Sequence, residues 1–469
     1  MESLQKGTLL DITVEDLNTS CEGLARVDGM VLFIPGLLPG EKASVRITEV
    51  KKGYARGVCE KITEKVHFRE TPACPHYDRC GGCDFMHVKY DKALELKAHI
   101  VAENLKRLGH VSWDEKKIKL IPAENKVHYR NKFLLPVRAD KDGRFVCGAF
   151  QRGSRDVVPI PHCLTQDLAA RDVMNYIAEK APGYGITPFN DKTKEGYLKG
   201  IGYRMEKRNK KMMLIFVITS DDTAPLQPLL DDLDFKFGHI DSVYANVNPD
   251  PDHTGLCGKN IHISGKEFLD MYLGKAMYKV GPSTFFQVNS RQAELLFQHV
   301  LSLLPFERWG AVWDLYAGVG ALSFFLASEF KRLYAVEIDP DSVEMAEKNK
   351  NRNFADNVTV IRGDLESLDV TQFEKPEVVV TDPPRTGLSE KLVTQLNKLR
   401  PTKIVLISCD SATLARDLDR LSEQYALKSM ALADMFPMTR HIETVTLLEK
   451  REGDDDEPRP LDQEIPGIS

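Results

Sequence analysis

The C-terminal third of the chain alternates short apolar segments with amphipathic ones, and this alternation limits the possible folds more than any other feature. The segment "RQAELLFQHVLSLL" has apolar residues at helical spacing, and five short runs are mostly apolar: "AVWDLYA", "RLYAVEI", "NVTVIRG", "EVVVTD" and "KIVLISC". Apolar runs of this length are typical of buried strands. Strands that alternate with helices predict a parallel sheet with helices on both faces. We therefore expect a Rossmann-like α/β domain over residues 281–452.

The rest of the chain divides into three further parts. Residues 1–64 hold short, partly alternating segments broken by Gly and Pro, which predict a small β-barrel. OB-like barrels, which often bind single-stranded nucleic acid, have this pattern, and the pattern alone does not separate them from other small barrels. Residues 65–280 predict a central mixed α/β domain, and we expect its helix near 90–120 to pack on the C-terminal domain. Residues 453–469 are acidic and predict a disordered tail.

The composition excludes several classes of protein. The net charge of −6 over 469 residues argues against a uniformly basic nucleic-acid binder, although basic clusters at 51–56, 129–132 and 207–211 would form a local phosphate-binding track. The N-terminus does not read as a signal peptide, and no stretch approaches the ~18 apolar residues of a membrane span. We therefore expect a cytoplasmic protein without a membrane partner, whose nine cysteines are reduced.

A glycine-rich turn predicts a nucleotide-like cofactor. Gly318 and Gly320 lie between a strand and a helix, and Glu337 ends the next strand 19 residues after Gly318. Glycines at this point let the backbone approach a ligand, and the carboxylate typically binds ribose hydroxyls. A dinucleotide fingerprint needs a third glycine where this chain has Ser323. Asp382, in "TDPPRTG", is expected at the same sheet edge, so we favour S-adenosylmethionine over a dinucleotide.

Cys409 is a candidate nucleophile. It lies between an apolar run at 405–407 and a helix expected over about 412–424. Alone, a cysteine in this position is more often a small core residue. The N-terminus of the following helix is expected to lower the pKa of the thiol, whereas the adjacent carboxylate of Asp410 is expected to disfavour the thiolate.

Four cysteines predict a metal site. Cys74, Cys80 and Cys83 follow a C-x5-C-x2-C pattern, and Cys163 in "PIPHC" is a fourth candidate. Zinc and iron–sulfur clusters both use four thiolates, and this spacing matches neither the common zinc-finger nor the ferredoxin pattern, so the metal stays open. The other four cysteines are expected to be structural: Cys21, Cys59, Cys147 and Cys257.

Several blocks in the same order resemble the RNA uracil-5-methyltransferases, especially bacterial enzymes that act on 23S ribosomal RNA. They are "GLARVDGMVLFIPGLLPGE", "CPHYDRCGGCDFMH", "FFQVN", "DLYAGVGALS", "VEID", "DPPRTG", "SCDSATLARDL" and "FPMTRHIETVTLL". The resemblance implies an N-terminal TRAM domain that holds RNA, a [4Fe-4S] cluster on the four cysteines, and S-adenosylmethionine as methyl donor. It also implies methylation of C5 of a specific uridine through a covalent Cys adduct at C6, and we expect a monomer.

The resemblance also assigns roles to single residues. Cys409 would be the nucleophile and Glu443 the general base, with His441, Glu443 and Val445 on one face of a strand. Cofactor contacts would come from Gln287, Tyr316, Glu337 and Asp382, with Gly318, Gly320, Ala321 and Asp364 as further candidates. The chain departs from the family at three places: Ala321 and Asp364 stand where relatives often have Asn, and Asp-Ser follows Cys409 in place of Asn-Pro.

The residue types fit the chemistry. Uracil C5 is a poor nucleophile until a thiolate adds to C6, and a base must then remove the C5 proton before the thiolate can leave. Within this class, transfer RNA is the alternative substrate, and a cytosine-5 methyltransferase is disfavoured because those enzymes use two active-site cysteines. From other classes, an iron–sulfur oxidoreductase that binds a dinucleotide is disfavoured by Ser323, and a non-catalytic RNA-binding protein by the presence of Cys409, Glu443 and Asp382.

Overall fold

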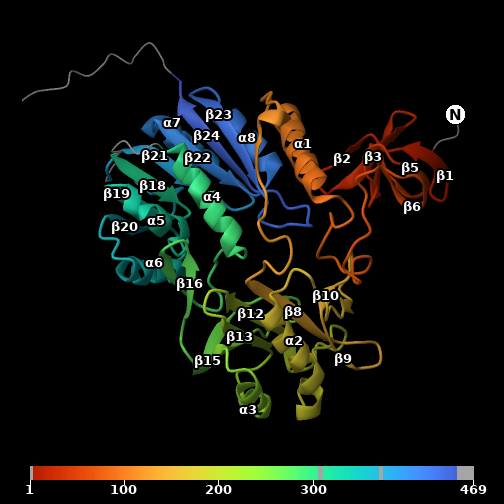
Figure 1. Ribbon diagram of the computed structural model, residues 1–469, viewed down its shortest axis with the longest axis vertical. Helices are drawn as coiled ribbons and strands as arrows, with labels where there is room; N and C mark the ends of the chain where they lie inside the picture. Colours follow the sequence, from red (N-terminus) through yellow and green to blue (C-terminus); the bar gives the residue numbers. More distant parts are fainter. Residues whose placement is uncertain (1–3, 305–309, 369–372, 452–469) are drawn as a thin grey trace, which may run out of the picture.

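The computed structural model describes residues 4–304, 310–368 and 373–451. Three sheet-based bodies are visible in Figure 1, with the N-terminal strands projecting from one side of the two larger bodies. The predicted acidic tail at 453–469 lies outside the described residues. Within the described ranges, no helix is both long and apolar enough to cross a membrane.

The N-terminal body is a single six-stranded sheet with the order β1-β5-β6-β4-β3-β2. Alternate residues of its longer strands are buried, as a sheet with one covered face requires, and they form a small core around Leu32, Ile34 and Val45. The strands are β1 (Leu9–Thr13), β2 (Asp16–Leu17), β3 (Glu22–Val27), β4 (Met30–Pro35), β5 (Lys42–Val50) and β6 (Tyr54–Glu64).

The central body is a second six-stranded sheet, ordered β15-β14-β13-β12-β8-β9. The basic turn at 207–210 joins its two central antiparallel strands, as the sequence predicts. The strands are β8 (Lys132–Ala139), β9 (Phe145–Cys147), β12 (Leu198–Glu206), β13 (Lys211–Ile218), β14 (Ile240–Val247) and β15 (Lys259–Gly265). Helices α2 (Leu168–Lys180) and α3 (Gln227–Lys236) and the paired strands β10 (Ala149–Phe150) and β11 (Val157–Val158) complete it, and the hairpin of β16 (Leu269–Leu273) and β17 (Ala276–Val280) leads onward.

The C-terminal body is an eight-stranded sheet ordered β20-β19-β18-β21-β22-β24-β23-β7. Its strands are β18 (Ala311–Leu315), β19 (Arg332–Glu337), β20 (Val358–Arg362), β21 (Pro376–Thr381), β22 (Lys403–Ser408), β23 (Tyr425–Ala433), β24 (Thr444–Lys450) and β7 (Lys119–Ile121). The helices are α4 (Ser290–Leu303), α5 (Ala321–Leu326), α6 (Pro340–Arg352), α7 (Glu390–Leu399) and α8 (Ser411–Leu421). The predicted parallel pairing is confirmed for β20, β19, β18, β21 and β22.

Two features of this sheet differ from the sequence prediction. Strand β24 is antiparallel to both of its neighbours, because residues 434–443 return the chain directly from β23 without a crossover helix. Strand β7 comes from the segment before the central sheet and pairs with β23 at the sheet edge.

Helix α1 (Tyr90–Leu108) packs on α8, and the Asn104 amide donates a hydrogen bond of 2.7 Å to the Ser411 hydroxyl.

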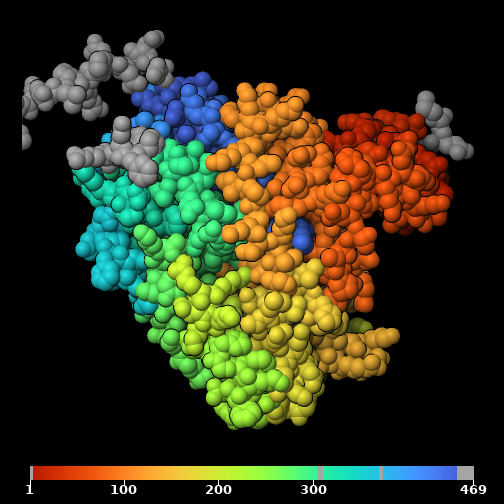
Figure 2. Space-filling model, in the orientation of Figure 1, coloured from red at the N-terminus to blue at the C-terminus, as the bar shows by residue number. Residues whose placement is uncertain are grey.

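Residues 65–130 therefore connect all three bodies. In Figure 2 this segment, coloured orange, lies across the C-terminal body on one side and meets the N-terminal module on the other. A small patch of late-sequence residues, coloured blue, is visible between its turns. The division of the chain at residues 64, 280 and 452 stays a prediction.

Candidate active site

The carboxyl ends of four parallel strands meet at one cavity. Strand β18 leads into the turn of Gly318, β19 ends at Glu337, β21 leads to Asp382 and β22 leads to Cys409. The cavity has a volume of about 1120 Å³ and is lined by all four residues and by Gln287 and Glu443. Residues from six segments, far apart in the sequence, thus face the same space.

The backbone of the glycine-rich turn is held in the left-handed region. Gly318 and Gly320 have φ angles of 56° and 80°, and a Cβ on Gly320 would collide with the ring of Phe324. The space at Gly318 is open, so a ligand can approach its backbone. Tyr316, a residue with a side chain, also has a positive φ of 62°, which is uncommon for residues other than glycine.

Ser323 has a structural role in place of the missing third glycine. Its side chain is fully buried, and its hydroxyl donates a 2.5 Å hydrogen bond to the Asp314 carboxylate beneath the turn. Burial raises the pKa of Asp314 to about 7. The serine therefore anchors helix α5 to strand β18, and a third glycine could not make this hydrogen bond.

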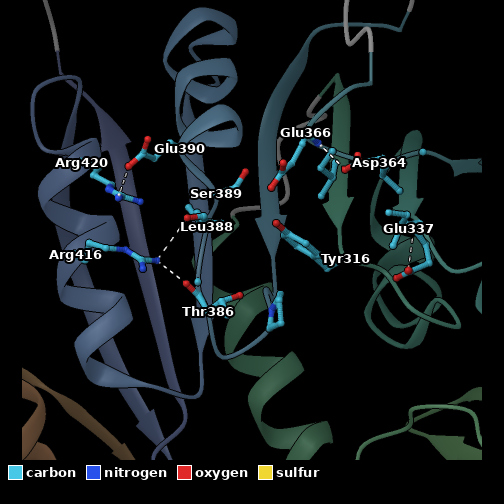
Figure 3. A pocket seen from close by; sticks show the side chains of 16 residues that line it. Tyr316, Glu337, Asp364, Glu366, Thr386, Leu388, Ser389, Glu390, Arg416 and Arg420 are labelled. Carbon is cyan, nitrogen blue, oxygen red and sulfur yellow. Dashed lines mark hydrogen bonds and ion pairs between the residues drawn. The ribbon is translucent and has the colours of Figure 1, made fainter. Parts of the chain in front are cut away.

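A second cavity, of about 450 Å³, adjoins the first and shares Tyr316, Glu337 and Pro384 with it. Asp364 lines this second cavity, and its carboxylate accepts a 2.9 Å hydrogen bond from the Glu366 amide. Figure 3 shows Tyr316 between the acidic side chains at the ends of β19 and β20 and the segment that leads into α7. Gly320 and Ala321 line neither cavity.

The Glu337 carboxylate is oriented by backbone amides at the junction of the two cavities. One oxygen accepts a hydrogen bond from the Gly318 N–H at 2.9 Å, and the other accepts from the Ile338 and Asp339 N–H groups, both at 2.8 Å. This places an acceptor between the glycine-rich turn and the second cavity, where the ribose of a nucleotide cofactor would lie.

The structure corrects the expected electrostatics of Cys409. Asp410 does not act as a destabilising neighbour of the thiol: its carboxylate caps α8 by accepting from the Ala412 and Thr413 amides, at 3.0 and 2.9 Å. The expected lowering of the thiol pKa is wrong. Burial raises the pKa of Cys409 to about 11, and nearby carboxylates add to this effect.

Three charged groups act on the Cys409 thiol from other segments. Glu443 and Asp382 raise its pKa and Arg385 lowers it. Burial, with the charge of Asp382, also raises the pKa of Glu443 well above the usual range, and burial raises that of Asp382 to about 6. The thiol therefore keeps its proton at neutral pH until a neighbouring group takes it.

Glu443 does not lie on a strand, contrary to the sequence prediction. Strand β24 begins at Thr444, so His441 and Glu443 belong to the loop between β23 and β24. The backbone carbonyl of Glu443 accepts a 2.8 Å hydrogen bond from the Ala433 amide, which continues the pairing for one step beyond the strand. The side chain lines the cavity beside Cys409.

The sequence analysis gave no catalytic or binding role to several further residues that line the same cavity, and four of them bear on its chemistry. Phe285 is 67% exposed, and Arg130, Arg385 and His441 bring side chains from three other segments. Burial lowers the pKa of His441 to about 4, so its ring is neutral at pH 7. Phe285 lies in the motif "FFQVN", Arg385 in "DPPR" and Arg130 in the basic cluster at 129–132, so local signals could have identified these three.

Comparisons with known proteins agree with this geometry. The family described as "tRNA (Uracil-5-)-methyltransferase" matches residues 264–451, and the TRAM domain matches residues 4–59. An "Uncharacterized RNA methyltransferase" of Staphylococcus epidermidis is 32% identical over 96% of this chain and all of its own length. One from Clostridium acetobutylicum is also 32% identical, over 95% of this chain and 98% of its own. The chain belongs to the RNA uracil-5-methyltransferases.

A solved structure extends the likeness to three dimensions. The structure is that of the Pyrococcus abyssi tRNA (uracil-54, C5)-methyltransferase in complex with S-adenosyl-L-homocysteine. It is 27% identical in sequence to the chain described here, and the two structures superpose with a TM-score of 0.76. The match covers 93% of this chain and 99% of the other. The C-terminal body of this methyltransferase thus has the fold of the S-adenosylmethionine-dependent enzymes.

The four predicted metal ligands lie around one small cavity of the methyltransferase. Cys74, Cys80, Cys83 and Cys163 line a space of about 60 Å³, and burial raises the pKa of Cys83 to about 12. In residues 4–304, 310–368 and 373–451, however, no three His, Cys, Asp or Glu side chains are placed to hold a metal ion. The structure brings the four thiols to one place but does not show a metal centre. Arg130 lines both this cavity and the one that holds Cys409.

Proposed function

We propose that this enzyme methylates C5 of a specific uridine in 23S ribosomal RNA, through a transient bond between the Cys409 sulfur and uracil C6. One observation carries the proposal: a single cavity contains Cys409, Glu443 and Asp382 and adjoins the glycine-rich turn. At about 1120 Å³ the cavity exceeds the range of a typical small-molecule site, as expected where a base and a cofactor must bind together.

The roles of the side chains follow from the protons that must move. A carboxylate takes the proton of the Cys409 thiol as the sulfur bonds to C6, which places negative charge on the ring and makes C5 nucleophilic. After C5 has gained the methyl group, the Glu443 carboxylate removes the C5 proton and the bond between sulfur and C6 breaks. Both steps need a base with a pKa near neutral. Burial raises the pKa of Asp382 to about 6 and raises that of Glu443 well above its usual range.

The cofactor contacts are proposed for Gln287, Tyr316, Glu337 and Asp382, with Gly318 and Asp364 also lining the two cavities. The open space at Gly318 and the acceptor at Glu337 fit a nucleoside with a ribose. S-adenosylmethionine supplies an electrophilic methyl group there. Gly320 and Ala321 are proposed only to shape the turn, because neither lines a cavity.

Folded RNA must present the uracil outside its base stack. Unstacking costs a few kcal/mol, which contacts to the neighbouring nucleotides must offset. The TRAM domain and the exposed ring of Phe285 at the cavity support such contacts, since aromatic rings stack on unpaired bases.

Transfer RNA is the second candidate substrate, since the Pyrococcus abyssi neighbour is named for uracil-54 of tRNA. The two substrates separate in one experiment. We expect a strain that lacks this enzyme to lose 5-methyluridine at one or more positions of 23S ribosomal RNA and to keep it in transfer RNA. Restoring the strain with wild type but not with Cys409→Ala should return the modification. Loss in transfer RNA alone would assign the alternative substrate.

We further propose that the four cysteines bind a [4Fe-4S] cluster. A single tetrahedral zinc ion with Zn–S bonds of ~2.3 Å needs its sulfur atoms within ~4 Å of each other. In a four-iron cluster each thiolate binds a different iron, so the sulfurs stand farther apart. The four thiols line one cavity, which supports a shared site for them, and the resemblance to the family selects the cluster over zinc. A monomeric state stays a prediction.

A further inference from the structure

A short segment forms the wall between the two cavities of the active site. Residues 384–389 follow Asp382-Pro383 and precede α7, with no regular secondary structure. Pro384 lines both cavities, Arg385 lines the one that holds Cys409, and Thr386 to Ser389 line the second. The position of this segment therefore affects both the thiol and the cofactor.

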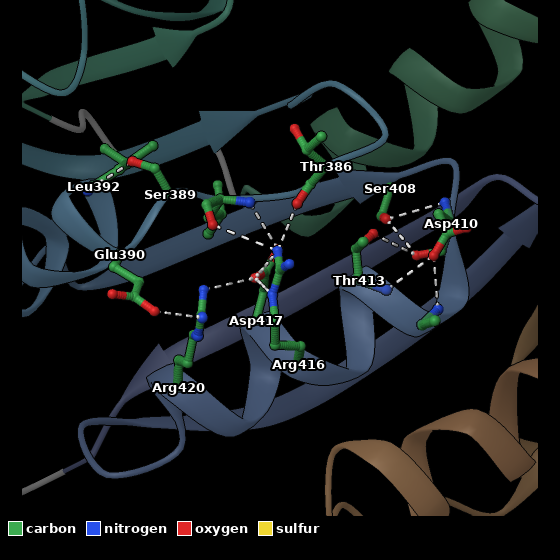
Figure 4. Close-up of polar contacts among 12 residues, drawn as sticks. Thr386, Ser389, Glu390, Leu392, Ser408, Asp410, Thr413, Arg416, Asp417 and Arg420 are labelled. Atoms are coloured by element: carbon green, nitrogen blue, oxygen red, sulfur yellow. Dashed lines mark hydrogen bonds and ion pairs between the residues drawn. The ribbon is translucent and has the colours of Figure 1, made fainter.

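Two adjacent residues of α8 hold the segment in place. The buried Asp417 carboxylate accepts a 2.8 Å hydrogen bond from the Leu388 amide, and its other oxygen accepts from Nε and Nη2 of Arg416 at 3.0 and 2.7 Å. Arg416 Nη2 also donates to the Thr386 carbonyl at 2.7 Å. Figure 4 shows these groups on the side of α8 that faces the segment. We name Asp417 and Arg416 the α8 clamp.

Gly387 allows the close approach that the clamp requires. Its φ is 72°, and a Cβ there would overlap the carboxylate of Asp417 and the guanidinium of Arg416. The Gly387 amide also donates to the Pro384 carbonyl at 2.8 Å, which closes a turn around Arg385. A side chain at this position would displace the segment from α8.

The same helix supports the nucleophile. Cys409 precedes the Asp410 cap of α8, and Asp417 lies two turns further along. Helix α8 is fixed in turn by its packing on α1. Because one rigid helix positions both Cys409 and the segment, the clamp determines where Arg385 stands relative to the thiol.

We propose that Asp417 is a positioning residue for methyl transfer, which holds segment 384–389 so that Arg385 stands beside Cys409. The proposal rests on the proposed role of Cys409 as nucleophile. The groups that face the thiol are Glu443, Asp382 and Arg385, and only Arg385 among these favours the thiolate. A displaced segment weakens that effect, so the thiol pKa rises and less thiolate forms at a given pH. Nothing in this argument requires the clamp to touch substrate.

The test measures the thiol itself in the free enzyme. The rate of Cys409 alkylation by iodoacetamide is followed from pH 8 to 11 by peptide mass spectrometry, with no RNA or cofactor. We expect Asp417→Asn, Gly387→Ala and Arg385→Gln each to move the profile to higher pH. The double variant Asp417→Asn,Arg385→Gln should move it no further than Arg385→Gln alone, since both act through one group. Asp419→Asn, an exposed carboxylate on the same helix, is the matched control and should leave it unchanged.

Turnover gives a second readout. In the first two variants we expect kcat for RNA methylation to fall by up to ~10²-fold, as a misplacement of about 1 Å can cause. Wild-type alkylation profiles in both Asp417→Asn and Gly387→Ala would overturn the proposal, as would additive shifts in the double variant. Because alkylation needs neither substrate nor cofactor, these results stand even if the proposed RNA target is wrong.

Discussion

The enzyme places cysteines in two very different cavities. Cys409 lines a cavity of about 1120 Å³ together with several carboxylates, Glu443 and Asp382 among them, and with Arg130 and Arg385. Cys74, Cys80, Cys83 and Cys163 surround a space of about 60 Å³, and the other three thiols act on the pKa of Cys83. The comparison teaches that the surroundings, rather than the residue type, distinguish the proposed nucleophile from the proposed metal ligands.

Burial acts on both sites in the same direction, but its consequences differ. It raises the pKa of Cys409 to about 11 and that of Cys83 to about 12. A nucleophile must then lose its proton to a base that stands next to it, which Glu443 and Asp382 provide. The groups that shift the pKa of Cys83 include no such base, so in the proposed cluster the positive charge of the metal would have to stabilise the thiolates.

The largest expected effect is the loss of activity in Cys409→Ala. Without a thiol nothing attacks C6, and removing a nucleophile can lower kcat by on the order of 10⁶-fold. The measurement is methyl transfer from labelled S-adenosylmethionine to RNA, together with the iron content. We expect iron to be unchanged. Cys257→Ala, which removes a thiol outside both cavities, should keep activity. Iron loss in Cys409→Ala would show that the two cavities are not independent.

The reciprocal change is Cys83→Ala. We expect protein purified without oxygen to be brown and to carry about four irons per chain in wild type, and this variant to lose most of them because a cluster of this type takes four thiolates. Calorimetry should show that S-adenosylmethionine still binds, since the cofactor residues lie in the other cavities. Stoichiometric zinc without iron in anaerobic wild type would contradict the cluster.

A smaller effect is expected from Glu337→Ala. A hydrogen bond from a ribose hydroxyl to the charged Glu337 carboxylate contributes roughly 1.5–3 kcal/mol to cofactor binding. Its loss corresponds to roughly 10- to 150-fold weaker binding. Glu337→Gln should lose less, because the amide keeps one oxygen as an acceptor. RNA binding is measured in parallel and should persist. Unchanged cofactor affinity in Glu337→Ala would remove this residue from the site.

The sequence predicts best those features that local patterns determine. Short apolar runs predict β18 to β22, and the glycines predict the turn at 318–320, because each depends on neighbouring residues only. The apolar run before Cys409 also predicts its position at the junction of a strand and a helix. The helix begins at Ser411, within one residue of the predicted start. These strands and the glycine-rich turn form the part of the cavity where the cofactor is proposed to bind.

Long-range contacts explain what sequence patterns did not predict. Strand β7 joins the sheet by pairing with β23, about 300 residues later, and no local pattern encodes that partner. Glu443 lies in the loop just before β24, where a single backbone hydrogen bond from the Ala433 amide continues the pairing with β23. The sign of the Cys409 pKa shift depends on burial and on the charges of Glu443 and Asp382 from two other segments, which no local pattern shows.

The most direct test of the central claim traps the bond between Cys409 and RNA. Glu443→Gln should still allow attack and methyl transfer, but C5 should keep its proton, so the methylated base stays bonded to the enzyme. With substrate RNA and S-adenosylmethionine, this variant should give an RNA–protein band on a denaturing gel, wild type little of it, and Cys409→Ala,Glu443→Gln none. A band that persists in the double variant would contradict the assignment of Cys409 as nucleophile, and normal turnover of Glu443→Gln would contradict the assignment of the base.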